Sequence, residues 1–108
     1  MNPEAIMAEV QKARPYTLVV LRRGPNYETT PGVHMDHLRH IFAMRAAGEQ
    51  ILTLPVTDPG EIAGIGLMAT ADKAAAEALI AADPAVRAGR LTYEIVSCMA
   101  LPGDAIPQ

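Results

Sequence analysis

Residues 16 to 23 read YTLVVLRR, a run of β-branched and apolar side chains that lies between two proline-containing turns. This composition and these boundaries predict a β-strand. Successive side chains of a strand point to opposite faces, so Leu18 and Val20 share one face while Val19 and Leu21 share the other. A strand that is apolar on both faces needs cover on both faces of its sheet.

The segments on either side of this strand predict further helices and strands. Apolar residues at helical spacing follow it, at Leu38, Ile41 and Phe42, and Gly48 is the expected helix stop. Residues 1–14 form an N-terminal extension in which Asn2 can cap a short helix, and Thr70 can cap a later one. The remaining expectations are a helix over 33–47, strands over 49–56 and 65–70, a helix over 71–82, a strand over 90–100 and a tail over 101–108.

The core, residues 16–100, therefore has the order strand, helix, strand, strand, helix, strand. This βαββαβ order predicts an α+β, ferredoxin-like fold in a single domain of 108 residues. We expect the first and last strands to lie on opposite sides of the third. The two helices would cover one sheet face, and a second copy of the sheet would cover the other. The sequence thus predicts a homodimer with its sheets face to face.

Composition argues against several classes of protein. The net charge is −3, so there is no clustered positive charge for nucleic acid. A single cysteine, Cys98, allows neither an internal disulfide nor a zinc site built on paired cysteines. No apolar run approaches the roughly 20 residues that cross a bilayer. The first residues include acids and no long apolar core, so we expect a cytoplasmic protein without a signal peptide and with no membrane partner.

Several short motifs occur in order along the chain: LRRGPN at 21–26, His37-Leu38, Gly48, Pro55, Gly64 and DPAVRAGRL at 83–91. Together they resemble the YCII-related (YciI-like) domain family over residues 16–98. The resemblance implies a ferredoxin-like fold that dimerises into an α+β barrel, with an active site at a histidine and an aspartate that match His37 and Asp83. Enzymes that are related to this family or share its fold act on small ring compounds by proton transfer. Two features depart from the family: Leu54 replaces a glycine, and the pair Ser97-Cys98 replaces Pro-Trp.

The stretch PGVHMDHLRH, residues 31–40, holds all three histidines of the chain at intervals of three. On a helix they fan over about 120° and do not converge, with His34 near the apolar stripe, His37 to its side and His40 towards water. A site made by His34, His37 and Asp83 could still bind a metal. We expect neither a bound metal nor an organic cofactor.

His37 has two interpretations. Imidazole titrates near neutral pH, so His37 could accept and return a proton, with Asp83 orienting its ring. Alternatively His37 is a boundary histidine whose ring bonds to the backbone. Asp83 likewise could cap the turn that begins at Pro84, and capping does not exclude a second contact because a carboxylate has two oxygens.

The loop after the first strand offers ligand-binding candidates. Arg22 or Arg23 could hold an anionic substrate, although both could equally be solvated at the strand end. Asn26 could offer polar groups to a ligand or simply shape a turn. Tyr27 could close a pocket or pack on the surface, and His34 is a further candidate contact.

The leading hypothesis is a small dimeric enzyme of lyase or isomerase type that moves protons on a small organic molecule. His37 would be the acid and base, and Asp83 its orienting partner. The alternative is a non-catalytic module that binds a small ligand or stabilises a larger assembly.

Overall fold

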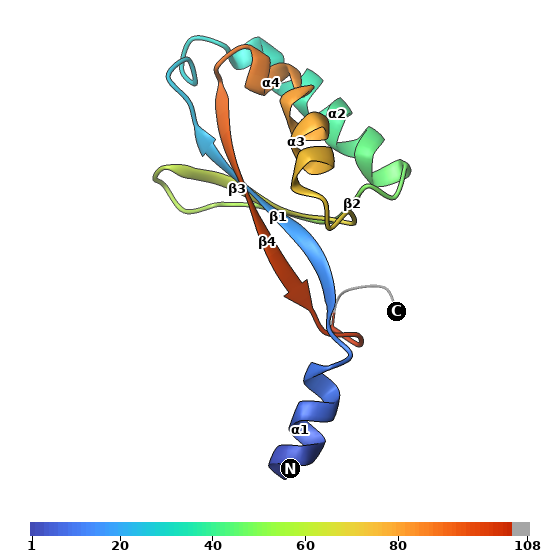
Figure 1. Ribbon diagram of the computed structural model, residues 1–108. Helices are drawn as coiled ribbons and strands as arrows, with labels where there is room; N and C mark the ends of the chain where they lie inside the picture. Colours follow the sequence, from blue (N-terminus) through green and yellow to red (C-terminus); the bar gives the residue numbers. More distant parts are fainter. Residues whose placement is uncertain (105–108) are drawn as a thin grey trace.

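A four-stranded antiparallel sheet with helices on one of its faces forms the body of the protein (Figure 1). The computed structural model describes residues 1–104, so the last four residues of the expected tail lie outside the described residues. The chain follows the order α1 (Pro3–Val10), β1 (Arg14–Arg23), η1 (Pro31–Val33), α2 (His34–Ala46), β2 (Gln50–Pro55), β3 (Ile62–Met68), α3 (Lys73–Ala81), α4 (Pro84–Arg87) and β4 (Leu91–Ala100). This α+β arrangement is compatible with the predicted ferredoxin-like fold.

The strands lie in the order β2-β3-β1-β4. The expectation that the first and last strands flank the third was therefore wrong, because β1 lies between β3 and β4. Val19 of β1 pairs with Gly66 of β3 on one side and with Ile95 of β4 on the other. Arg23 at the end of β1 lies opposite Leu91 at the start of β4. The loop that leaves β1 consequently runs beside the turn that enters β4.

Two helix caps show how far local signals determine helix starts. Asn2 caps α1 as predicted, accepting a hydrogen bond from the Ala5 backbone N–H at 2.8 Å, and α1 extends away from the sheet (Figure 1). The cap of α3 is Asp72 and not Thr70, because the Asp72 carboxylate accepts from the Ala74 N–H at 3.0 Å. Thr70 instead accepts from the Asp72 N–H at 3.1 Å.

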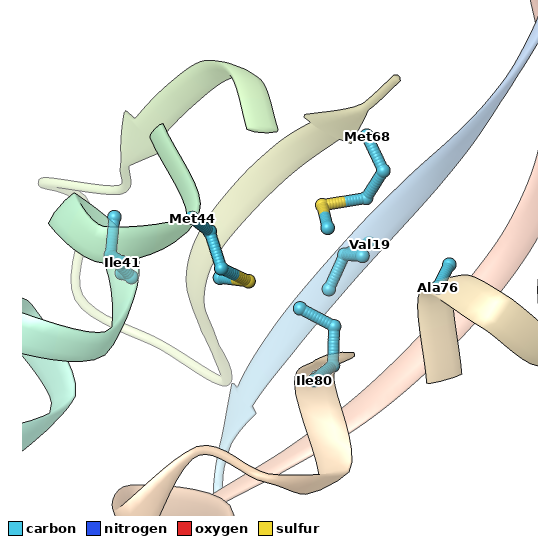
Figure 2. Packing of buried hydrophobic residues seen from close by; sticks show 6 residues of the cluster. All are labelled: Val19, Ile41, Met44, Met68, Ala76 and Ile80. Carbon is cyan, nitrogen blue, oxygen red and sulfur yellow. The ribbon is translucent and has the colours of Figure 1, made fainter. Parts of the chain in front are cut away.

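The main hydrophobic core lies between the helices and the sheet. It contains Val19, Ile41, Met44, Met68, Ala76 and Ile80 (Figure 2). Tyr93 and Ile95 of β4 pack against this cluster. The Tyr93 hydroxyl donates to Glu77 of α3 at 3.0 Å, and this hydrogen bond raises the pKa of Tyr93. The same bond joins α3 to β4.

The buried face of α2 is rotated from the face that apolar spacing predicts. Its buried residues are His37, Ile41 and Met44, while Phe42 is 63% exposed. His40 does not point to water either, since its Nε2 donates to the Leu79 carbonyl at 2.8 Å. The predicted buried face was wrong because histidine was treated as a polar residue that stays at the surface. Here α3 and the start of α4 provide hydrogen-bond partners, so histidine side chains can turn inwards.

The other face of the sheet carries a second apolar cluster. Tyr16 and Leu67 are buried there, and Leu18, Leu52 and Cys98 pack against them. Burial raises the pKa of the Cys98 thiol. Helices α2, α3 and α4 all lie on the opposite face (Figure 1). The two-sided apolarity predicted for the first strand is thus confirmed. No helix within residues 1–104 is long and apolar enough to cross a membrane.

Candidate functional site

The loop after β1 is fastened to the turn before β4. The Gly24 N–H donates to the Arg90 carbonyl at 2.7 Å, and the Asn26 N–H donates to the Gly89 carbonyl at 2.9 Å. The Asn26 side chain adds a bond to the Ala88 carbonyl at 3.0 Å. Gly24 must lack a side chain, because a Cβ there would overlap the Gly89 carbonyl oxygen. This junction sets the start of α2 beside α4.

His37 and Asp83 meet at this junction and are both buried, with exposed fractions of 8% and 2%. Asp83 is the N-cap of α4, and its Oδ1 accepts from the Ala85 N–H at 2.9 Å. Its Oδ2 lies 2.5 Å from His37 Nδ1. The expected contact is therefore present, and Asp83 both caps a helix and contacts the imidazole.

The contact determines which ring nitrogen of His37 carries the proton. A carboxylate can only accept hydrogen bonds, so His37 Nδ1 is the donor to Asp83. In the neutral ring, Nε2 then holds a lone pair. No residue among the described 1–104 forms a hydrogen bond with Nε2, and His37 lines a cavity. Nε2 can therefore accept a proton from a bound molecule and later return it.

The cavity has a volume of about 480 Å³ and lies between α2 and the sheet. Most of its wall is apolar, with Val19, Leu21, Ile41 and Met44 among the lining residues. Its size falls within the range of about 300–1,000 Å³ that is usual for small-molecule sites. Apolar walls strengthen electrostatic interactions inside such a cavity by lowering the local dielectric constant.

Positive charge in the cavity lacks a matching acid. Arg23, Arg45 and Arg90 line it, and Asp83 is the one acidic residue among the described residues that line it. Across residues 1–104 these three arginines form no salt bridge. Arg22 differs, since it does not line the cavity and pairs with Glu94 at 2.9 Å and with Glu61 at 3.4 Å. The strand alternation thus sends Arg23 to the cavity and Arg22 to the opposite face.

Tyr27 anchors two of these arginines. The guanidinium carbons of Arg90 and Arg23 lie 4.1 Å and 5.3 Å from the centre of its ring. Arg90 also donates to the Tyr27 carbonyl at 2.5 Å, and Arg23 donates to the carbonyls of Gly60 and Ile62. Both arginines therefore hold loops in place as well as lining the cavity.

Of the other two predicted ligand contacts, His34 lies at the cavity and Asn26 does not. His34 lines the cavity, and its ring centre lies 6.1 Å from that of His37. Asn26 does not line it, because its side chain bonds to Ala88. In the part of the chain that the structure describes, no group of three or more His, Cys, Asp and Glu side chains could hold a metal ion.

Sequence reasoning missed the polar residues on the far side of the cavity, Arg45, Gln50 and Thr53. Arg45 gives no signal in the apolar spacing of the helix, because its guanidinium is charged. The alternation of β2 could have placed Gln50 and Thr53, but a bulge lies between Gln50 and Leu52 and shifts the register.

No protein-family model matches the chain, and no curated protein matches it. The resemblance to YCII-related domains therefore stays a hypothesis. The assignment of function depends on the geometry around His37.

Proposed function

We propose that this protein is a small acid–base enzyme, of lyase or isomerase type, that moves a proton on a small anionic ring compound. The observation that carries the proposal is the buried His37–Asp83 pair, with Nε2 of His37 unbonded beside the cavity. The resemblance to YCII-related domains supports the same pair.

The chemistry follows from the tautomer. His37 Nε2 takes a proton from a substrate carbon, and the electron pair of the broken C–H bond moves into the neighbouring unsaturated system. Asp83 stabilises the imidazolium that forms. The imidazolium then returns the proton to a different carbon, which completes an isomerisation, or to a leaving group, which completes an elimination. The cavity arginines stabilise the anion that exists between the two steps.

Proton exchange in D₂O tests this proposal. Small ring carboxylates and lactones are incubated with the protein, and ¹H NMR follows the loss of individual C–H signals. His37→Asn keeps an amide N–H for Asp83 and removes the Nε2 base, so exchange should slow about 10²- to 10⁴-fold.

His40→Gln is the matched control. Its amide N–H can still donate to the Leu79 carbonyl, and His40 does not line the cavity, so exchange should stay at the wild-type rate. Unchanged exchange in His37→Asn would refute the role of His37.

A second candidate is a non-catalytic module that binds a small anion. The three cavity arginines without acidic partners favour it, because they would attract an anion whether or not His37 reacts. Binding of ring carboxylates by the wild-type protein, with no C–H exchange in any of them, would select this function.

We further propose a homodimer in which two sheets pack face to face and form an α+β barrel. The support is the apolar cluster on the face opposite the helices, where Tyr16, Leu18 and Leu67 gather. Two packed sheets are a common way to cover such a face.

A further inference from the structure

We infer that Arg45 and Thr53 form a carboxylate subsite on the α2–β2 side of the cavity, which holds the anionic group of the ligand. The inference rests on the proposed function, because it assigns an orientation to the substrate of that site. Binding by the subsite does not require proton transfer, so the two can be tested apart.

Within residues 1–104, the hydrogen bonds of Thr53 leave its hydroxyl proton without an acceptor. Thr53 Oγ1 lies 3.0 Å from Arg45 Nη1 and 2.9 Å from Gln50 Nε2. Gln50 Nε2 also lies 3.2 Å from the Leu52 carbonyl, which can only accept, so this atom is the amide nitrogen and not the oxygen. Both neighbours therefore donate to Oγ1. A hydroxyl has two acceptor positions and one proton, and the proton must donate elsewhere.

The glycine opposite Thr53 makes room for the Gln50 amide at the cavity wall. Thr53 pairs with Gly66 of β3, which also lines the cavity and presents no side chain. A Cβ on Gly66 would lie 3.1 Å from the Gln50 amide nitrogen. The glycine thus lets the Gln50 amide lie where it donates to Thr53 Oγ1, and Thr53 itself lines the cavity.

Arg45 is the cavity arginine with donors to spare. Among residues 1–104 it forms a hydrogen bond only with Thr53, and its guanidinium carbon lies 5.8 Å from the centre of the Phe42 ring. Arg23 and Arg90, in contrast, donate to backbone carbonyls and stack on Tyr27. A guanidinium has five N–H donors in a planar fork that fits a carboxylate. Arg45 and the Thr53 hydroxyl can therefore bind one carboxylate together.

The position of this subsite orients the ligand. Arg45 follows His37 by eight residues of α2, which at 1.5 Å per residue is about 12 Å along the helix axis. The carboxylate and the reacting carbon therefore lie at different ends of the bound molecule. The substrate class is a ring compound with its carboxylate on one side and its exchangeable C–H on the other.

Benzoate and benzamide test the subsite, because they share a shape and differ in charge. NMR titration of ¹⁵N-labelled protein gives both dissociation constants. The wild-type protein should bind benzoate at millimolar concentration or better, about tenfold or more tightly than benzamide. Arg45→Gln should abolish this preference, and Thr53→Val should weaken benzoate binding severalfold.

Three variants make the test specific. Thr53→Ser keeps the hydroxyl, so, unlike Thr53→Val, it should bind benzoate about as tightly as the wild-type protein. Arg39→Gln, on the exposed side of α2 where Arg39 pairs with Asp36, should leave the preference unchanged. His37→Asn should also retain it, so that a failure of the proton-transfer proposal leaves this result intact. Thermal denaturation confirms that each variant is folded.

Several outcomes would overturn the inference. They are equal affinity for benzoate and benzamide, no benzoate binding at millimolar concentration, or a preference that survives Arg45→Gln. Loss of the preference in Arg90→Gln but not in Arg45→Gln would place the anion at the Tyr27 end and would also overturn it.

Discussion

At the scale of single residues, Asp83 explains how a charged side chain can be almost completely buried. Burying an ionised carboxylate is costly unless its oxygens have donors. Oδ1 has the Ala85 N–H and Oδ2 has the His37 imidazole. A residue that looked like an ordinary turn cap is therefore also the group that selects the tautomer of His37.

Replacing Asp83 separates these two roles. Asp83→Ala removes the cap, which should lower the free energy of unfolding by about 0.5–2 kcal/mol. It also leaves His37 without its buried partner, which should lower it by about 1–3 kcal/mol more. Asp83→Asn keeps an oxygen for the cap and should be much closer to wild type in stability. Its amide would donate to His37 Nδ1, which moves the ring proton to Nε2 and removes the base. Urea denaturation measures the stabilities, and ¹⁵N NMR of the imidazole identifies the tautomer.

Asp72→Ala is the matched control, since the exposed Asp72 caps α3 by the same type of bond and has no buried histidine partner. Asp72→Ala should lose only the stability that a helix cap contributes, about 0.5–2 kcal/mol. An Asp83→Ala variant no less stable than Asp72→Ala would show that the histidine contact adds nothing to folding.

At the scale of secondary-structure elements, the decisive feature is the junction between the loop after β1 and the turn before β4. Hydrogen bonds cross it from Gly24 and Asn26 to the segment 88–90, and from the Arg90 side chain back to the Tyr27 carbonyl. Gly89 has a φ of +74°, which a residue with a side chain rarely adopts. The motifs GPN at 24–26 and AGR at 88–90 are thus needed for close backbone packing. This packing places His37 next to Asp83.

Gly24→Ala tests the junction. The new Cβ would overlap the Gly89 carbonyl, so the backbone has to move and the protein should lose about 1–3 kcal/mol of stability. Gly32→Ala is the control, because a Cβ there meets no atom within 4 Å. Both are measured by urea denaturation. Equal stability of the two variants would mean that the junction is looser than the structure indicates.

At the scale of the whole molecule, the sheet divides the protein into a helix-covered half and an open half. The cavity lies on the helix side, and the second apolar cluster lies on the open side. A sheet with a hydrophobic surface on both faces is stable only when both are covered. The proposed dimer would cover the open face without obstructing the cavity wall formed by α2.

Sedimentation velocity at micromolar concentration tests the dimer. The wild-type protein should sediment as a dimer with an interface of roughly 1,200 Å² or more. Leu18→Lys puts a charge in the open face and should yield monomers. Met35→Lys, which changes an exposed apolar residue on α2, should remain dimeric. A monomeric wild-type protein would refute the proposal.

The sequence by itself determined the local features of this protein. The period of two in β1 assigned Val19 and Leu21 to one sheet face and Leu18 to the other, as found. Asn2 could be recognised as a cap because its partner, Ala5, is three residues away. Such features depend on neighbours along the chain, and side-chain alternation and capping need nothing else.

Only the tertiary structure decided the strand order, the rotation of α2 and the polar lining of the cavity. His37 and Asp83 are separated by 46 positions, and they meet because β4 pairs with β1. The same packing turned His37 inwards and brought Arg45 to Thr53. The physical reason is that a buried polar group follows its hydrogen-bond partner, and the location of a distant partner is set by strand pairing and not by local spacing.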